Sequence, residues 1–238
     1  MKQINKYICD HFENDKFSIL EHVQNSNFSI FEHFENSKFS IYERLHINKD
    51  IKSYNYHPKT DDELKKLVNN LIKERGNYCS LNDIDTSKIT DMHYLFVNSE
   101  FNGNISEWDV SNVKDMSYMF KESYFNGDIS EWDVSNVKDM NHMFFNSKFT
   151  EKNGDLSTWD VSKVEDMSYM FCYSEFNGDI SEWDVSNVKD MEFMFSKSKF
   201  NGDISQWDVS NVEDMQFMFY ESSLEKNPPK WYKLINSL

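Results

Sequence analysis

One repeated phrase dominates the sequence, and it first appears complete as FNGNISEWDVSNVKDMSYMF at residues 101–120. It recurs with few changes as far as Phe219, and a degenerate earlier copy begins near Leu81, so the chain holds about six units. The tryptophans mark the register, with spacings of 24, 27, 24 and 24 residues: Trp108, Trp132, Trp159, Trp183 and Trp207. A repeat of this length is typical of a solenoid, in which each unit buries its apolar face against its neighbours.

Two kinds of apolar spacing alternate within each unit. Trp108 and Val110 are separated by one residue, which places both side chains on one face of a strand. Val113, Met116 and Phe120 then step by three and four residues, which is the spacing of a helix. Each unit is therefore predicted to hold one short strand followed by a helical turn or two.

Polar residues supply the expected connections between these elements. Asn112 is predicted to cap the helical segment, and Asp115 completes a capping-box-like pair with it. The dipeptide Asn102-Gly103 is predicted to reverse the chain before the next strand, because glycine tolerates positive φ. The expected fold is an α/β, leucine-rich-repeat-like solenoid, with one curved parallel sheet and short helices on the opposite side.

The phrase W-D-V-S-N-V-x-D-M-x-x-M-F resembles the repeat of the BspA-like leucine-rich repeat family. The resemblance covers residues 81–223 and rests on five nearly complete copies. It implies a solenoid with a parallel sheet on one side. It also implies a surface protein with roles in adhesion or protein binding.

The repeats, at residues 81–223, are flanked by segments that are expected to cap them. Residues 51–80 are predicted to form a linker and a capping helix, with Thr60 as N-cap and Gly76 at the end. The apolar stripe of this helix consists of Leu64, Leu67, Val68, Leu71 and Ile72. Residues 224–238 are predicted to form the C-terminal cap, through Trp231, Leu234 and Ile235.

A shorter repeat occupies the N-terminal arm, residues 1–50. The copies KFSILEHVQNS, NFSIFEHFENS and KFSIYERLHIN follow one another with a period of 11 residues. A helix keeps one apolar face over such repeats, which favours a helical arm. Extended structure is the alternative, because Phe-Ser-Ile also alternates.

Charge and composition limit the partners and the location. The formal net charge of -16 disfavours nucleic acid and anionic membranes as partners, and favours a basic protein partner or cations. The sequence contains neither an apolar run long enough for a membrane helix nor a secretory signal at its start. We therefore expect a cytoplasmic protein, with the cell surface as the alternative that the family resemblance implies. Cys9, Cys79 and Cys172 are scattered and indicate no disulfide framework.

Side chains between the core positions of each predicted strand should face outward and form a partner-binding surface. The candidate residues are Glu107, Asp109, Ser111, Glu131, Asp133, Ser135, Asp160, Ser162, Glu182, Asp184, Ser186, Asp208 and Ser210. Stacked strands would place equivalent carboxylates about 4.8 Å apart, and their mutual repulsion should raise their pKa. Alternatively, each aspartate accepts hydrogen bonds from a nearby serine or backbone N–H. A second row is assigned to helix capping: Asp115, Asp139, Asp166, Asp190 and Asp214.

Other chemically suggestive residues have ordinary explanations. The repeated tryptophans and methionines have the spacing of a packed core rather than of a sugar or metal site. His11, His22 and His33 share the 11-residue phase, which favours a solvated face over a weak metal row. Because the sequence lacks a nucleophile elbow, a P-loop and an HExxH motif, we expect no catalytic residue, no cofactor and no metal.

Two functions are consistent with these features of the sequence. The first is a non-enzymatic protein–protein interaction module that uses the acidic concave face of the solenoid. The second is a structural, assembly or adhesin-type protein that forms oligomers through the N-terminal arm.

Overall fold

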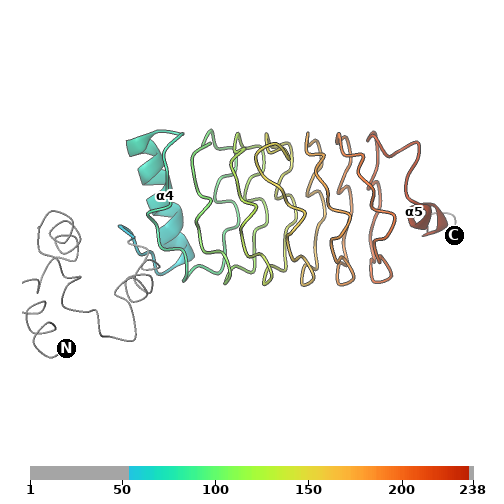
Figure 1. Ribbon diagram of the computed structural model, residues 1–238, viewed down its shortest axis with the longest axis horizontal. Coiled ribbons are helices and arrows are strands. Elements are labelled where there is room, and N and C mark those ends of the chain that lie inside the picture. The colour runs from blue at the N-terminus through green and yellow to red at the C-terminus, as the bar shows by residue number, and fades with distance from the viewer. Residues whose placement is uncertain (1–53, 236–238) are drawn as a thin grey trace, which may run out of the picture. The chain divides into compact units, whose positions relative to one another are not determined.

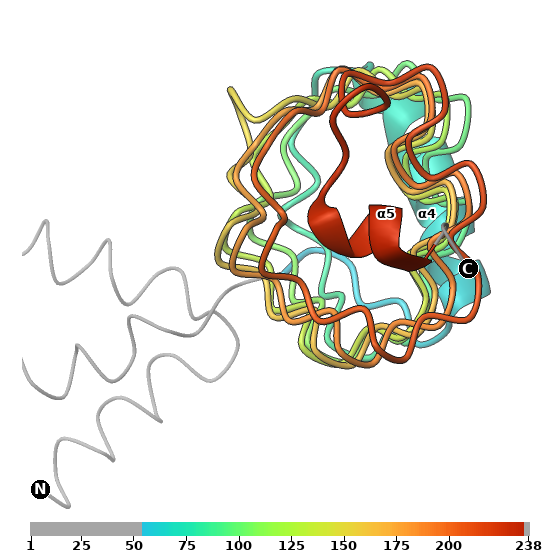
Figure 2. The same cartoon turned by 90° about the vertical axis from the view of Figure 1, so that its right-hand side faces the viewer.

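The computed structural model describes residues 54–235 of the chain. Within this range it contains two helices, α4 (Asp61–Arg75) and α5 (Lys230–Ile235), with a stack of similar units between them (Figure 1). Viewed along the stack, the units follow one another around nearly the same closed outline (Figure 2). The N-terminal arm, with the helix predicted there and the histidines His11, His22 and His33, lies outside the described residues.

The prediction of an α/β solenoid with a curved parallel sheet is wrong. The units between residues 81 and 223 contain no strand, and they meet at isolated parallel bridges such as Asp115↔Asp139. The segment predicted as a strand turns twice, because Trp108 N–H donates to the Ile105 carbonyl at 3.1 Å and Val113 N–H to the Val110 carbonyl at 2.9 Å. Alternation of apolar and polar residues suggests an extended chain, but tight turns also bring these side chains to the same interior.

The prediction of short helices on the opposite side of each unit is also wrong. Tyr118 and Glu122 have φ of 58° and 54°, and the other units have left-handed residues at the same two positions. Met119 N–H bonds the Met116 carbonyl three residues back, at 3.2 Å. A residue in the left-handed region interrupts an α-helix, so the apolar steps of three and four residues belong to successive turns.

Alternate backbone N–H groups of this segment bond to the next unit instead. Met116 N–H donates to the Asp139 carbonyl at 2.9 Å, and Phe120 N–H to the Met143 carbonyl at 3.0 Å. A helix would use these N–H groups within its own segment. The unit therefore has bonds between units in place of internal helical bonds, and this is why the predicted helix does not form.

Aspartate side chains fix the turns of each unit. In one unit, Asp128 accepts the Ser130 N–H at 3.0 Å, and Asp133 accepts the Ser135 N–H at 3.1 Å. Asp139 accepts the N–H of Asn141, two residues later, at 2.9 Å. Such Asx turns hold the backbone in a turn without helix or strand.

Asn112 does not cap a helix, as the sequence predicted, but bonds to the preceding unit. Its side-chain N–H donates to the Ser87 carbonyl of the preceding unit at 3.0 Å. Asn136 repeats the bond to Ser111 at 2.8 Å. These asparagines therefore join neighbouring units.

Gly103 does not adopt the positive φ that the sequence suggested, and among the described glycines only Gly76 does. A Cβ atom at Gly103 would lie 1.9 Å from the Cys79 carbonyl oxygen. Close approach to the preceding unit therefore requires glycine at this position.

The interior consists of columns of equivalent side chains, and the predicted packing of tryptophans and methionines is confirmed. The five repeat tryptophans are 3–4 % exposed, and Met116 and Met119 are fully buried. Each indole N–H reaches a carbonyl of the preceding unit, as Trp108 does to Leu81 at 2.9 Å and Trp132 does to Ile105 at 3.2 Å. The tryptophans thus satisfy their one polar group while they fill the core.

The helix predicted from Thr60 is present as α4. The Thr60 side chain accepts the Glu63 N–H, and the helix ends at Gly76 with φ 89°. Leu64, Val68 and Leu71 are buried. The cap signals and the apolar stripe lie within one segment, which is why the sequence predicts this helix well.

At the other end, α5 places Trp231 in the tryptophan register of the repeats. Its indole N–H donates to the Ile204 carbonyl at 2.9 Å, as an additional unit would. Leu234, which is predicted for the same cap, is 68 % exposed. The side chain of Ile235 lies outside the described residues.

Candidate functional site

The predicted partner-binding residues form what we call the acidic row, namely Asp109, Asp133, Asp160, Asp184 and Asp208, with neighbouring glutamates and serines. All five aspartates are exposed, as are Glu107, Glu131 and Glu182. The aspartates accept the backbone N–H groups of Ser111, Ser135, Ser162, Ser186 and Ser210 at 3.0–3.1 Å. The hydrogen-bonded alternative for this row is thus confirmed.

The expected rise in pKa along the acidic row is wrong for the residues where a shift is resolved. Hydrogen bonds from Ser162 and Ser210 lower the pKa of Asp160 and Asp208, respectively. A donor favours the charged carboxylate, and in this exposed row water screens the repulsion between units. The Asp160 and Asp208 side chains are therefore ionised and fixed in orientation at neutral pH.

The row assigned to helix capping has the properties that we expected of the acidic row. Together with Asp91 it forms what we call the bridge row, whose half-buried members pair across the units: Asp91, Asp115, Asp139, Asp166, Asp190 and Asp214. Burial, with a smaller effect of neighbouring aspartates, raises the pKa of Asp139 and Asp190. Within residues 54–235, no lysine or arginine makes an ion pair with any of the six.

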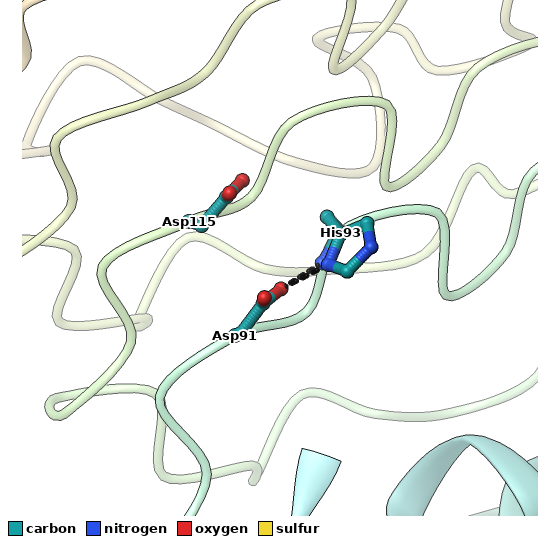
Figure 3. A group of neighbouring side chains, drawn as sticks. All are labelled: Asp91, His93 and Asp115. Atoms are coloured by element: carbon teal, nitrogen blue, oxygen red, sulfur yellow. Dashed lines mark hydrogen bonds and ion pairs between the residues drawn. The ribbon is translucent and has the colours of Figure 1, made fainter. Parts of the chain in front are cut away.

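At one end of the bridge row, three of the described side chains could together hold a metal ion. Ligand atoms of Asp91, His93 and Asp115 lie within 4.8 Å of one another (Figure 3). His93 Nδ1 is 2.5 Å from Asp91 Oδ1, which also accepts the His93 N–H at 2.8 Å. Sequence reasoning missed this group, although the signal was a histidine where the next unit has Ser117. Two carboxylates and an imidazole suit a divalent transition metal.

Sequence reasoning also missed an aromatic ladder on the surface. It consists of Tyr94, Tyr118, His142, Tyr169, Phe193 and Phe217, whose successive ring centroids are 4.4–5.0 Å apart. All six residues have φ between 53° and 58°, so the left-handed backbone turns these rings outward. The available signal was an aromatic or histidine residue just before each Met-Phe pair of the repeat.

Burial within the stack changes the chemistry of the ladder. It raises the pKa of Tyr118 and Tyr169. Burial, with the nearby Lys121, lowers the pKa of His142 to about 4, so this imidazole is neutral at physiological pH. The ladder is therefore an uncharged aromatic strip.

A cavity of about 370 Å³ lies at the C-terminal end of the ladder. Its lining combines four aromatic residues with one carboxylate and one amide: Gln216, Phe217, Phe219, Tyr220, Glu225 and Tyr232. Sequence reasoning did not predict this cavity, because its walls come from the last repeat and from the segment around α5.

The two described cysteines are both free thiols. Burial raises the pKa of Cys172 to about 11, and that of Cys79 is raised in the same way. Both are therefore protonated at neutral pH, a form with little nucleophilic reactivity.

Comparison with known proteins identifies a family. The family model described as "Mycoplasma protein of unknown function, DUF285" matches residues 62–171 and 146–234. No curated protein and no solved structure matches the chain significantly. Among residues 54–235, the helices are too short or too polar to cross a membrane.

Proposed function

The chain belongs to the DUF285 family, and from this premise we propose that it is a non-enzymatic protein–protein interaction module. It binds a basic protein partner through the acidic row. The resemblance of its repeat to the BspA-like family supports the proposal, because that resemblance implies protein binding or adhesion. It supports a location at the cell surface as the alternative to the cytoplasm.

The observation that carries the proposal is the fixed orientation of the acidic row. Each aspartate is held by the N–H two residues later, at 3.0–3.1 Å, and the row repeats once per unit. Hydrogen bonds from serine lower the pKa of Asp160 and Asp208, so these carboxylates stay charged. When lysines or arginines of a partner bind these carboxylates, the aspartate side chains are already held in one orientation. Less side-chain entropy is therefore lost on binding.

The second candidate function is assembly through the N-terminal arm. It rests on the 11-residue repeats in residues 1–50. Native mass measurement of chains with and without these residues tests it, since the assembly function requires a larger species only when the arm is present.

The acidic row can be tested against a second row of exposed aspartates that make the same kind of hydrogen bond. Asp128, Asp179 and Asp203 are exposed and accept serine N–H groups at 3.0, 3.0 and 2.9 Å. The test variant carries Asp133→Asn, Asp184→Asn and Asp208→Asn, and the control variant carries Asp→Asn at the matched row. Both lose three charges in the same kind of turn.

The probe is a fluorescently labelled decalysine peptide, whose binding is followed by anisotropy at low salt. We expect the test variant to bind roughly ten-fold more weakly, as three exposed contacts of about half a kcal/mol each would give. The control variant should bind nearly as the wild type does. Equal losses in both variants would mean that only net charge matters, and the proposed face would be abandoned.

A further inference from the structure

We propose that the cavity at the C-terminal end of the aromatic ladder binds an organic cation with a quaternary ammonium group, such as choline. This inference does not depend on the proposed protein-binding function, since the cavity contains no residue of the acidic row.

The rings around the cavity stand at steep angles to one another. Phe217 and Tyr220 have an interplanar angle of 86° with centroids 6.1 Å apart. Phe219 and Tyr232 have an angle of 75° with centroids 4.8 Å apart. Along the ladder, in contrast, the rings lie nearly parallel, as Phe193 does on Phe217 at 24°. Phe219 is 2 % exposed and packs behind Tyr232, so the accessible aromatic surface comes from Phe217, Tyr220 and Tyr232. Rings at steep angles present that surface from more than one side, which is how aromatic cages hold a cation.

The last ladder ring is available for this contact. Phe217 is 51 % exposed and Tyr220 is 42 % exposed. A cavity of about 370 Å³ falls within the roughly 300–1,000 Å³ of small-molecule sites. It can hold a trimethylammonium group and part of the molecule that carries it.

Charge in and near the cavity favours a cation. Glu225 contributes its carboxylate to the lining. The nearby Lys197 is already engaged, with its Nζ 2.9 Å from the Tyr173 hydroxyl and 3.6 Å from Glu221. The same Nζ lies 5.9 Å from the Tyr220 ring centroid, so this ring already interacts with a positive charge. A chain of net charge -16 adds a favourable field.

The kind of cation follows from the hydrogen-bonding groups. A primary ammonium brings three N–H donors and a guanidinium five, and all need acceptors when they leave water. Besides its rings, the lining offers as acceptors one carboxylate, one amide oxygen and the hydroxyls of Tyr220 and Tyr232, and the Tyr220 hydroxyl already bonds Glu221. A quaternary ammonium has no N–H donor to satisfy, so it gains the ring and carboxylate attraction at the lowest desolvation cost.

The binding experiment titrates the full chain with choline and with tetramethylammonium, followed by calorimetry and by tryptophan fluorescence. The ring centroids of Trp231 and Tyr232 are 6.1 Å apart, so the fluorescence of Trp231 should change when a cation occupies the cavity. The uncharged isostere dimethylbutanol has the same shape as choline without its charge. We expect saturable binding of both cations, and binding of the isostere that is at least roughly ten-fold weaker.

Two variants remove the cation's contacts, and each has a matched control. Phe217→Leu removes the last ring, whereas Phe193→Leu removes the preceding ring of the same ladder, which does not line the cavity. Glu225→Gln removes the carboxylate, and Glu213→Gln is its control, at an exposed residue of the last repeat outside the lining. We expect choline affinity to fall roughly ten-fold in Phe217→Leu and several-fold in Glu225→Gln, with both controls close to wild type.

A thermal melt of each variant tests whether the variant remains folded. Vesicles of phosphatidylcholine, compared with vesicles of phosphatidylglycerol, distinguish a lipid headgroup from free choline as the source of the cation. Binding to either source that Phe217→Leu weakens supports the proposal. The proposal is overturned if neither cation binds saturably, if dimethylbutanol binds as tightly as choline, or if Phe193→Leu weakens binding as much as Phe217→Leu.

Discussion

At the residue scale, one amino acid has opposite properties in two rows of the same repeat. Asp160 is exposed, and hydrogen bonds from Ser162 lower its pKa. Asp139 is half-buried beside like charges, and burial is the main cause of its raised pKa. Hydrogen-bond donors therefore determine the pKa shift of Asp160, whereas the loss of surrounding water determines that of Asp139.

Substitution by asparagine should distinguish these two environments at pH 7. Asp160→Asn exchanges a charged acceptor for a neutral one and should destabilise the fold, by less than about 1 kcal/mol because the site is exposed. Asp139→Asn removes a buried charge while an amide oxygen can still accept the Asn141 N–H, so stability should be unchanged or higher. Urea midpoints of the two variants check this, and a clear loss in Asp139→Asn would show that its charge is stabilising.

The sequence could predict which residues these are but not their environments. It correctly offered serine or backbone donors for the acidic row, because Asp-x-Ser is a local motif. It could not show that Asp139 and Asp190 lie half-buried between units, since that burial depends on how neighbouring turns stack. The same limit hid the aromatic ladder and the group of Asp91, His93 and Asp115.

At the element scale, α4 provides the first described repeat with contacts that a preceding repeat provides elsewhere in the stack. In the repeats, the Lys114 carbonyl accepts both the Lys138 and the Asp139 N–H groups, at 2.8 and 3.3 Å. At the start of the stack, Asp61 Oδ1 accepts the equivalent Thr90 and Asp91 N–H groups, at 3.0 and 3.2 Å. One side-chain oxygen thus acts as the missing carbonyl.

Removing this oxygen should destabilise the stack. Asp61→Ala leaves two backbone N–H groups without their acceptor, which should cost about 1–3 kcal/mol. The control is Asp62→Ala, an exposed residue of the same helical turn that loses only its favourable interaction with the helix dipole. Urea denaturation of both variants gives the comparison, and similar midpoints would show that Asp61 does not cap the stack.

The helix was predictable and the interior of the repeats was not, for a physical reason. All signals for α4 lie within 17 consecutive residues, from Thr60 to Gly76. In a repeat, spacings that suit a strand and a helix also suit a series of turns. The choice among them depends on hydrogen bonds to residues about 23 positions away, as from Met116 to Asp139. No local pattern contains that information.

At the scale of the whole repeat stack, the central claim is that each unit is a series of turns with two left-handed residues. The sequence correctly indicated units that bury apolar columns against one another. It did not indicate left-handed backbone, because residues such as Tyr118 and Glu122 rarely adopt it. The bonds that each unit makes to the next compensate for that backbone cost.

Glycine substitution at Glu122 tests this claim most directly. Glu122 is exposed with φ 54°, where a residue other than glycine is strained, and Lys114 in the same unit is exposed without positive φ. If the turns are correct, Glu122→Gly relieves strain that offsets the added entropy of the unfolded chain, and the free energy of unfolding stays equal or rises by up to about 1 kcal/mol. Lys114→Gly should lose about 0.5–1 kcal/mol. If urea denaturation instead shows Glu122→Gly losing as much as Lys114→Gly, the segment is a helix and the series of turns is wrong.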